Sequence, residues 1–437
     1  MKRCLALLAS TLMIGASWAT GILVVNAQNS KTLVSKQANT AFMPASNTKL
    51  FTAAAMYRLF SPTYHFQTTL SEKQNTLYLT FSGDPSLSVA DLQGLLSHLP
   101  KHHHYHGMVL VPFPVVGPAH PLGTVVDDTA YCWSGAIKPA TLNGNCLTVR
   151  IIDKDHHPSV QAIGLLRPSR IINHLNWANA QQLKSCVFQP SSTGSNQLTL
   201  QGCLPKRPQW TFSFAANRPL TLVKQLVYKA LKQRDITLER GITIGKASVN
   251  AKPIAQHTSQ DLQALLTTML TDSNNLYAET FTVLLGQKVY GVPSLKAGSN
   301  AITHTLVNWA KINPRYFHLE DGAGESRYNL VSPHTIVTVL TAIYHDETLR
   351  PLFFSALAKG GKTGTLAHRF THLPKGVDIY AKTGSMNGVS TLSGYLIRPH
   401  HATLIFSIMN NGIIGSLNIA RQWQDQYIKY LLKSSFV

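Results

Sequence analysis

The chain has 437 residues, of which 44% are hydrophobic and 13% are charged. This composition excludes a disordered protein, and the length favours two or three domains. Lys and Arg number 39 against 19 acidic residues, so the formal net charge of +20 attracts polyanions. The basic residues are scattered and form no nucleic-acid-binding motif, so we expect no nucleic-acid partner. A plain solvated surface and a peripheral association with an anionic membrane or wall both fit the charge.

The N-terminus has the pattern of a secretion signal, and we predict that residues 1–19 are a signal peptide. Lys2 and Arg3 precede an apolar stretch that ends in small residues. Cleavage after Ala19 or after Ala27 fits; we favour Ala19, because the later cut would remove a predicted strand at 22–25. The apolar run is also long enough for an uncleaved membrane anchor, which stays open as an alternative.

Four cysteines follow the signal, as expected for an exported protein, and they allow three pairings. We predict two local disulfides, because each pair of sequence neighbours brackets a short segment: Cys132 with Cys146, and Cys186 with Cys203. Zinc is the competing interpretation, but no Cys-x-x-Cys spacing is present. We expect no metal and no cofactor. The run His-His-His-Tyr-His at 102–106 could bind a metal, and we favour a solvated loop there.

The first elements predicted are a strand hairpin and a helix. The strands fall at 22–25 and 32–34, and the helix follows Pro44. Four apolar residues of this helix recur on one face: Leu50, Phe51, Ala54 and Tyr57. Beyond it, residues 68–246 alternate short β-like runs with turns and contain all four cysteines. We interpret this stretch as a large β-rich insert of one or two modules, with strands including 77–79, 108–111 and 198–200.

Helical and strand patterns alternate after the insert, so the fold class is α/β. Helices are predicted at 261–270, 276–285 and 417–432, and strands at 377–381, 389–397 and 403–409. The last helix has an apolar stripe of residues four apart: Ile419, Trp423, Tyr427 and Leu431. Packing against a sheet explains this stripe most simply, and membrane contact is the alternative.

Three short motifs carry the candidate chemistry. They are Ser46-Asn47-Thr48-Lys49, Ser273-Asn274-Asn275 and Lys382-Thr383-Gly384. Each motif alone is weak evidence, but the set in this order is strong. Residues three apart on a helix share a face, so Lys49 reaches the hydroxyl of Ser46 and can take its proton. We expect the like charge of Lys382 to lower the pKa of Lys49.

The remaining motif residues suit the binding of a peptide and the transfer of its protons. Ser273 can relay a proton to a leaving amine, and the amide of Asn275 can hold a substrate backbone. Thr383, together with Lys382, suits a terminal carboxylate. We expect the backbone N–H groups of Ser46 and Ser385 to form an oxyanion hole.

These motifs and several longer segments resemble the penicillin-binding D-alanyl-D-alanine carboxypeptidases and endopeptidases of the penicillin-binding protein 4 type. The segments include Phe42-Met43-Pro44-Ala45-Ser46, Ser82-Gly83-Asp84-Pro85-Ser86-Leu87, Leu276-Tyr277-Ala278-Glu279 and Asp321-Gly322-Ala323-Gly324-Glu325-Ser326-Arg327. The resemblance implies a β-lactamase/transpeptidase-like domain built from 20–67 and 247–437, interrupted by the insert at 68–246. It also implies a periplasmic enzyme that forms an acyl-enzyme on Ser46, acts on peptidoglycan stem peptides and cross-links, and binds β-lactams.

The resemblance further implies a side pocket for the free amino-acid end of diaminopimelate, with Met386, Arg369 and Asp128 as candidates. Gly384 and Ser385 are expected beside the substrate. Two departures from the family pattern concern the site. The second motif reads Ser-Asn-Asn where Ser-Asp-Asn is common. Glu325 replaces a usual apolar residue, which we expect to affect local packing and not the chemistry.

Lys-Thr-Gly occurs twice, and only one copy can lie beside Ser46. The copy at Lys362 follows two glycines, which favours a loop, whereas the copy at Lys382 ends an alternating strand pattern. We predict that Lys382 is the catalytic copy. Two other functions were weighed against the peptidase: a β-lactamase, for which we identify no dedicated deacylating Glu, and a non-catalytic wall-binding protein, which the intact motifs disfavour. The sequence does not decide the oligomeric state or whether carboxypeptidase or endopeptidase activity dominates.

Overall fold

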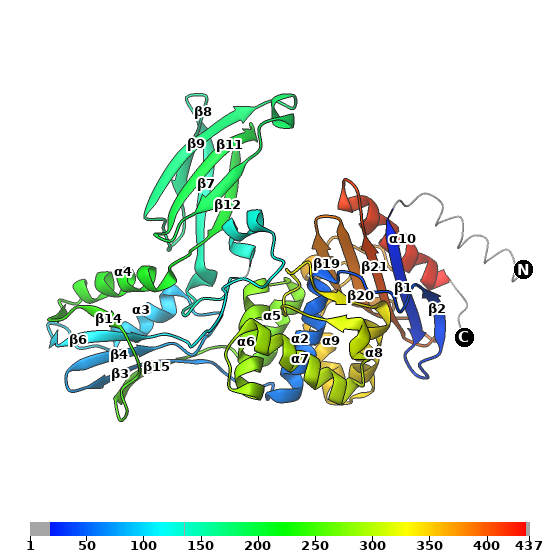
Figure 1. The fold of residues 1–437 in the computed structure, drawn as a ribbon, viewed down its shortest axis with the longest axis horizontal. Helices are drawn as coiled ribbons and strands as arrows, with labels where there is room; N and C mark the ends of the chain where they lie inside the picture. The colour runs from blue at the N-terminus through cyan, green and yellow to red at the C-terminus, as the bar shows by residue number, and fades with distance from the viewer. Residues whose placement is uncertain (1–17, 135, 434–437) are drawn as a thin grey trace, which may run out of the picture.

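The computed structural model describes residues 18–134 and 136–433. A main domain with a central sheet carries two modules, one beside it and one projecting away from both (Figure 1). The predicted signal peptide lies outside the described residues, except for its last two. Within the described part of the chain, no helix is both long and apolar enough to cross a membrane.

The main domain is built on a six-stranded antiparallel sheet to which both ends of the chain contribute. Its order is β18-β19-β20-β21-β1-β2. The bounds are β1 Ala19–Asn26, β2 Thr32–Lys36, β18 Ala358–Lys359, β19 Asp378–Met386, β20 Val389–Ile397 and β21 Leu404–Asn411. The predicted hairpin and the three C-terminal strands are therefore confirmed. Strand β1 buries both of its faces: Ile22 packs on the side of the last helix and Leu23 on the side of the other helices.

Helices cover both faces of this sheet (Figure 1). They are α2 Thr48–Leu59, α5 Leu262–Thr271, α6 Asn275–Tyr290, α7 Leu295–Ala310, α8 Pro333–His345 and α9 Leu349–Ala356, with α10 Leu417–Lys433 on the opposite face. A short two-stranded sheet, β16 Phe317–His318 and β17 Leu330–Val331, completes this domain. The arrangement confirms the α/β prediction.

Two predicted helix faces need correction. Helix α2 is buried from Thr48 through Tyr57, on every side, because helices and sheet surround it. In α10 the predicted stripe drifts off the core: Ile419 is 57% exposed, and the buried face contains Gln424 and Ile428 in addition to Tyr427 and Leu431. A spacing of four exceeds the helical repeat of 3.6, so the stripe winds around the helix.

The first module is a five-stranded mixed sheet with two helices and its own apolar core. The strands are β14 Ile242–Ile244, β6 Gly107–Val111, β4 Thr76–Thr80, β3 Gln67–Lys73 and β15 Lys252–Thr258, and the helices are α3 Val89–Ser97 and α4 Pro219–Lys232; β5 His104–Tyr105 and β13 Thr237–Leu238 pair nearby. Strand β15 lies beyond residue 246, where the sequence analysis ends the insert. The sheet therefore continues to Thr258, because β15 pairs along β3.

The second module consists of two three-stranded sheets that share a small apolar core. Their strands are β7 Cys146–Lys154, β8 His157–Ala162, β9 Arg170–Ala178, β10 Gln189–Ser192, β11 Gln197–Pro205 and β12 Gln209–Ala215. Both predicted disulfides form here, with Cα–Cα distances of 5.2 Å for Cys132–Cys146 and 5.5 Å for Cys186–Cys203.

The histidine-rich run turns its side chains to separate neighbours. His102 lies 3.4 Å from Asp235, and His104 shares a hydrogen bond of 2.7 Å with Thr237. Among the described residues no group of three potential metal ligands comes together.

Candidate active site

The first motif places a serine and a lysine in contact at the start of α2. Ser46 lies in a 3-10 turn, Ala45–Asn47, that runs directly into the helix. Lys49 is fully buried, and its Nζ donates to Ser46 Oγ at 3.1 Å, to Asn275 Oδ1 at 2.5 Å and to the Ala323 carbonyl at 2.6 Å. The predicted contact between the two motif residues is therefore present.

Burial lowers the pKa of Lys49 to about 8, although the neighbouring carboxyl groups of Glu325, Asp321 and Glu279 act in the opposite direction. A lowered pKa of Lys49 is as predicted, but the charge of Lys382 is not its main cause. The structure gives burial as the main cause, because the ammonium group lies away from water. Like-charge repulsion is instead seen at Lys382, whose pKa lies well below its ordinary value through burial first and Lys49 second.

A loop at 321–327 presses against the turn that carries the nucleophile. Asp321 is buried and holds the loop by accepting backbone N–H bonds from Gly324 at 2.7 Å and Glu325 at 2.8 Å. Gly324 has φ +85, and a Cβ there would lie 1.9 Å from the Ala45 carbonyl oxygen. Only glycine permits this approach, which brings the loop carbonyl of Ala323 to Lys49.

The second motif lies at the start of α6. Asn274 caps the helix by accepting from the Tyr277 N–H at 3.1 Å, so the change from Asp to Asn keeps a good N-cap. The amide Nδ2 of Asn275 donates to the Trp133 carbonyl at 2.8 Å and to Glu325 Oε1 at 2.9 Å. The group predicted to hold a substrate backbone is therefore engaged by the protein, since two acceptors face it.

The third motif lies on β19, next to the nucleophile turn. Lys382 is fully buried, and its Nζ donates to the Thr383 carbonyl at 2.9 Å. A Cβ on Gly384 would lie 2.7 Å from the Pro44 carbonyl and 2.2 Å from Thr391 Oγ1, which shows how tightly the strand packs there. The other copy is different, because Lys362 is exposed in a turn after β18.

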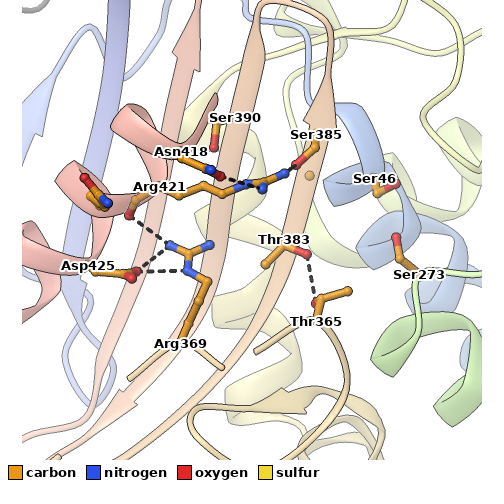
Figure 2. A pocket seen from close by; sticks show the side chains of 12 residues that line it. Ser46, Ser273, Thr365, Arg369, Thr383, Ser385, Ser390, Asn418, Arg421 and Asp425 are labelled. Carbon is orange, nitrogen blue, oxygen red and sulfur yellow. Dashed lines mark hydrogen bonds and ion pairs between the residues drawn. The ribbon is translucent and has the colours of Figure 1, made fainter. Parts of the chain in front are cut away.

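The nucleophile borders a cavity of about 570 Å³, which we call the main cavity. Its lining includes Ser46, Ser273, Thr365, Thr383, Gly384, Ser385, Arg369, Arg421 and Asp425. Figure 2 shows the two serines of the first two motifs on one side and the two arginines on the other. Thr383 Oγ1 donates to Thr365 Oγ1 at 2.9 Å.

The two arginines of the main cavity differ in their partners. Arg369 is held by Asp425, with its Nη2 2.6 Å from Oδ1. Arg421 instead donates to Ser385 Oγ at 3.0 Å and to Asn418 Oδ1 at 3.2 Å. Both of those partners are neutral, so the positive charge of Arg421 is available to an anion in this cavity (Figure 2).

A second cavity of about 220 Å³, the side cavity, also borders Ser46. Its lining includes Asp128, Trp133, Asn275, Glu325, Arg327, Ser385 and Met386. Two of the three side-pocket candidates, Asp128 and Met386, thus share a cavity. Arg369 does not belong with them, because its pairing with Asp425 keeps it in the main cavity.

Three residues of the site are missed by the roles assigned from sequence. Arg327 is the last residue of the segment 321–327 that carries the family resemblance, so its position could have indicated a place in the site. Arg421 gave none, since it is a single cation on a distant helix. Glu325 is expected to affect only local packing; the structure also gives it a hydrogen bond to Asn275 and a place on the border of the side cavity with Ser46.

A buried lysine hydrogen-bonded to a serine, beside a cavity lined by a second serine and a strand bearing Lys-Thr-Gly, defines a serine hydrolase that works through an acyl-enzyme. The model of the D-Ala-D-Ala carboxypeptidase 3 (S13) family matches residues 7–431. The chain belongs to this family of serine peptidases, which confirms the enzyme class that the motifs predict.

Individual relatives agree along most of the chain. A D-alanyl-D-alanine carboxypeptidase of Actinomadura sp. (strain R39) is 26% identical over 92% of this chain and 79% of its own length. The carboxypeptidase DacB of Haemophilus influenzae is 24% identical over 90% of this chain and 85% of its own. The crystal structure of penicillin binding protein 4 (dacB) from Haemophilus influenzae superposes with a TM-score of 0.86 at 22% identity, covering 97% of this chain and 99% of that one. This likeness confirms the predicted fold.

Proposed function

We propose that the protein is a serine-type D-Ala-D-Ala peptidase that forms its acyl-enzyme on Ser46 and acts on the stem peptides of peptidoglycan. One observation carries the proposal: Lys49 Nζ lies 3.1 Å from Ser46 Oγ and is buried, which lowers its pKa to about 8. A lysine with such a pKa is partly neutral near pH 7, so it can accept the serine proton. The carboxypeptidase relatives and the family support the choice of substrate.

In the acylation step, Lys49 takes the proton of Ser46 and Oγ attacks the carbonyl carbon of the scissile D-Ala-D-Ala bond. The backbone N–H groups of Ser46 and Ser385, which border the main cavity, stabilise the oxyanion. Ser273 lies on the same cavity and relays the proton from Lys49 to the leaving amine. Breaking the C–N bond leaves an ester on Ser46, which water then hydrolyses.

The leaving residue carries a carboxylate one carbon from the scissile nitrogen, and the main cavity provides groups for it. Thr383 offers a hydroxyl and Arg421 a positive charge, while Arg369 is already neutralised by Asp425. The bicyclic β-lactams carry a carboxylate in a similar place. This match supports the expectation that they acylate Ser46.

The side cavity suits the zwitterionic end of a diaminopimelate side chain. Asp128 can pair with its ammonium group and Arg327 with its carboxylate, while Met386 contacts the methylene chain. Burial raises the pKa of Asp128, and the nearby charge of Arg327 lowers it. This assignment replaces Arg369 with Arg327 in the predicted pocket.

An envelope location fits this function, and we propose export by a signal peptide cleaved after Ala19. Strand β1 begins at that residue, so a cut there removes only its first residue, whereas a cut after Ala27 would remove all of it. N-terminal sequencing of the exported protein should begin at Thr20. A start at Gln28 would contradict the proposal.

Rapid-quench intact-mass measurement after benzylpenicillin tests the assignment of the nucleophile. We expect one adduct on the native protein and none on Ser46→Ala. An adduct on the variant would contradict the proposal. Digestion of purified muropeptides, monomer against cross-linked dimer, then measures the carboxypeptidase and endopeptidase activities separately.

A further inference from the structure

Glu325 is an acidic residue inside the active site that the mechanism above does not use. It is 9% exposed, and its Oε1 accepts the Asn275 amide at 2.9 Å. Its Oε2 is buried and accepts no hydrogen bond from any described residue. Glu325 and Ser46 border the same side cavity. A buried carboxylate oxygen without a protein donor is a strong acceptor for a water molecule.

We propose that Glu325 is the general base that activates the hydrolytic water, so that this protein hydrolyses penicillins as well as peptides. The inference rests on the proposed acyl-enzyme at Ser46. In class A β-lactamases, a Glu activates the water that hydrolyses the acyl-enzyme. The same chemistry is available here, because Glu325 joins Ser46 through Asn275 and Lys49.

The step balances in atoms and protons. Glu325 Oε2 takes one proton from water, and the water oxygen bonds to the carbonyl carbon of the ester. The tetrahedral intermediate collapses as the carbon–Oγ bond breaks, and Ser46 Oγ takes a proton from Lys49 as Lys49 receives the proton held by Glu325. The products are a carboxylic acid and free Ser46. Glu325 is then ionised again and Lys49 is neutral again, as the next acylation requires.

The environment of Glu325 allows it to change charge near neutral pH. The charged groups around it are Lys49 on α2, Glu279 on α6, Asp128 of the insert, and Asp321 and Arg327 on its own loop. Burial raises the pKa of Glu325 to about 8, and Asp321 adds to the rise while Lys49 opposes it. The ionised base therefore increases as pH rises, and deacylation should accelerate toward pH 8.

A purely structural role would have Glu325 only orient Asn275. Glu325→Gln separates the two roles, because glutamine keeps an acceptor for the Asn275 amide but cannot take a proton. Glu325→Leu removes both capacities. Glu320→Gln is the matched control, since this carboxylate on the same loop pairs with Lys296 and His318 away from the site.

The experiment forms the benzylpenicilloyl-enzyme, removes free drug by rapid desalting, and follows loss of the adduct by intact mass after a pH jump. We expect Glu325→Gln to form the penicilloyl adduct but to lose it about a hundredfold more slowly than the native protein. Native protein and Glu320→Gln should deacylate faster as pH rises from about 6 to about 8, and Glu325→Gln should lose this dependence.

Three outcomes would overturn the inference. They are a Glu325→Gln adduct that decays at the native rate, a native adduct that survives unchanged for hours, and a native decay rate independent of pH. The last two need no variant, so a misfolded Glu325→Gln leaves the inference testable. Failure to acylate native Ser46 at all would instead remove the proposed function.

Discussion

The two Lys-Thr-Gly copies have the same three residues and opposite surroundings. Lys382 is fully buried on β19 against the nucleophile turn, whereas the Lys362 side chain is 63% exposed in a turn, 4.0 Å from Asp378. Burial and the charge of Lys49 lower the pKa of Lys382 well below its ordinary value. The tripeptide therefore carries no chemistry by itself. Packing against Pro44 and Ala45 gives one copy its role, and a solvated turn leaves the other without one.

Removing the buried copy should have the largest effect. We expect Lys382→Ala to lower the second-order rate of benzylpenicillin acylation about a thousandfold or more, because the site loses a preorganised donor beside the nucleophile. Stopped-flow or quenched mass measurement gives the rate, and circular dichroism checks folding. A rate close to native from folded Lys382→Ala would mean that the buried copy is not the catalytic one.

The glycine of the buried copy should be nearly as sensitive. Gly384→Ala places a Cβ 2.7 Å from the Pro44 carbonyl, so β19 must move away from the nucleophile turn. We expect acylation to fall about a hundredfold and the free energy of unfolding to fall by about 1–3 kcal/mol. Gly94→Ala is the control, because nothing lies within 4 Å of its added Cβ. Unchanged acylation in Gly384→Ala would show that the close packing is dispensable.

Arg421 lines the main cavity together with Thr383 of the buried copy, and its role in binding a carboxylate can be tested. Arg421→Ala should slow acylation by carboxylate-bearing penicillins and peptides about tenfold to a hundredfold, the value of a charged hydrogen bond. With a substrate whose terminal carboxylate is amidated, native protein and Arg421→Ala should be acylated at the same rate. Exposed Arg315→Ala controls for the overall charge. Equal losses with both substrates would argue against a carboxylate site.

The buried environment should also appear in the pH dependence of acylation. Lys49 accepts the Ser46 proton only in its neutral form, and burial lowers its pKa to about 8. The acylation rate should therefore rise with pH and level off above about 8. Initial rates across pH, each corrected for folded protein, give the curve. A rate already constant at about pH 6 would require a different base.

The exposed copy should matter least. We expect Lys362→Ala to change acylation less than about twofold, because a solvent-exposed ion pair contributes little. The same assay measures it beside Lys382→Ala. A loss comparable to that of Lys382→Ala would reverse the choice between the copies.

Local patterns predicted much of the fold. The bounds of β20 coincide with the predicted 389–397, and the strand is buried at every position except the last. The β-rich description of the insert leaves out α4, although Val223, Val227 and Leu231 lie at helical spacing. The predicted insert ends at residue 246, before β15. Local patterns do not show that β15 belongs to the same sheet, because its pairing with β3 is a long-range contact.

Contacts within one helical turn of the site were predicted, whereas contacts between distant segments were not. Ser46 and Lys49 lie one helical turn apart, so their contact follows from sequence alone. Arg421 and Glu325 reach the site only through tertiary packing, and no local spacing reports on that. The same holds for Asn275, whose amide partners come from the insert and from the loop at 321–327. The domain limits and the roles of the side-cavity residues stay predictions.

Strand β1 pairs along its whole length with β21, from Ala19 opposite Asn411 to Asn26 opposite Leu404. The sheet therefore pairs a strand made early in synthesis with one made much later, a contact of very high sequence separation. The two modules have cores of their own and can fold while the rest of the chain is still being made. Helix α2 can be packed only later, because the residues that surround it lie largely after residue 260. Reactivity at Ser46 is therefore among the last properties that the folding chain acquires.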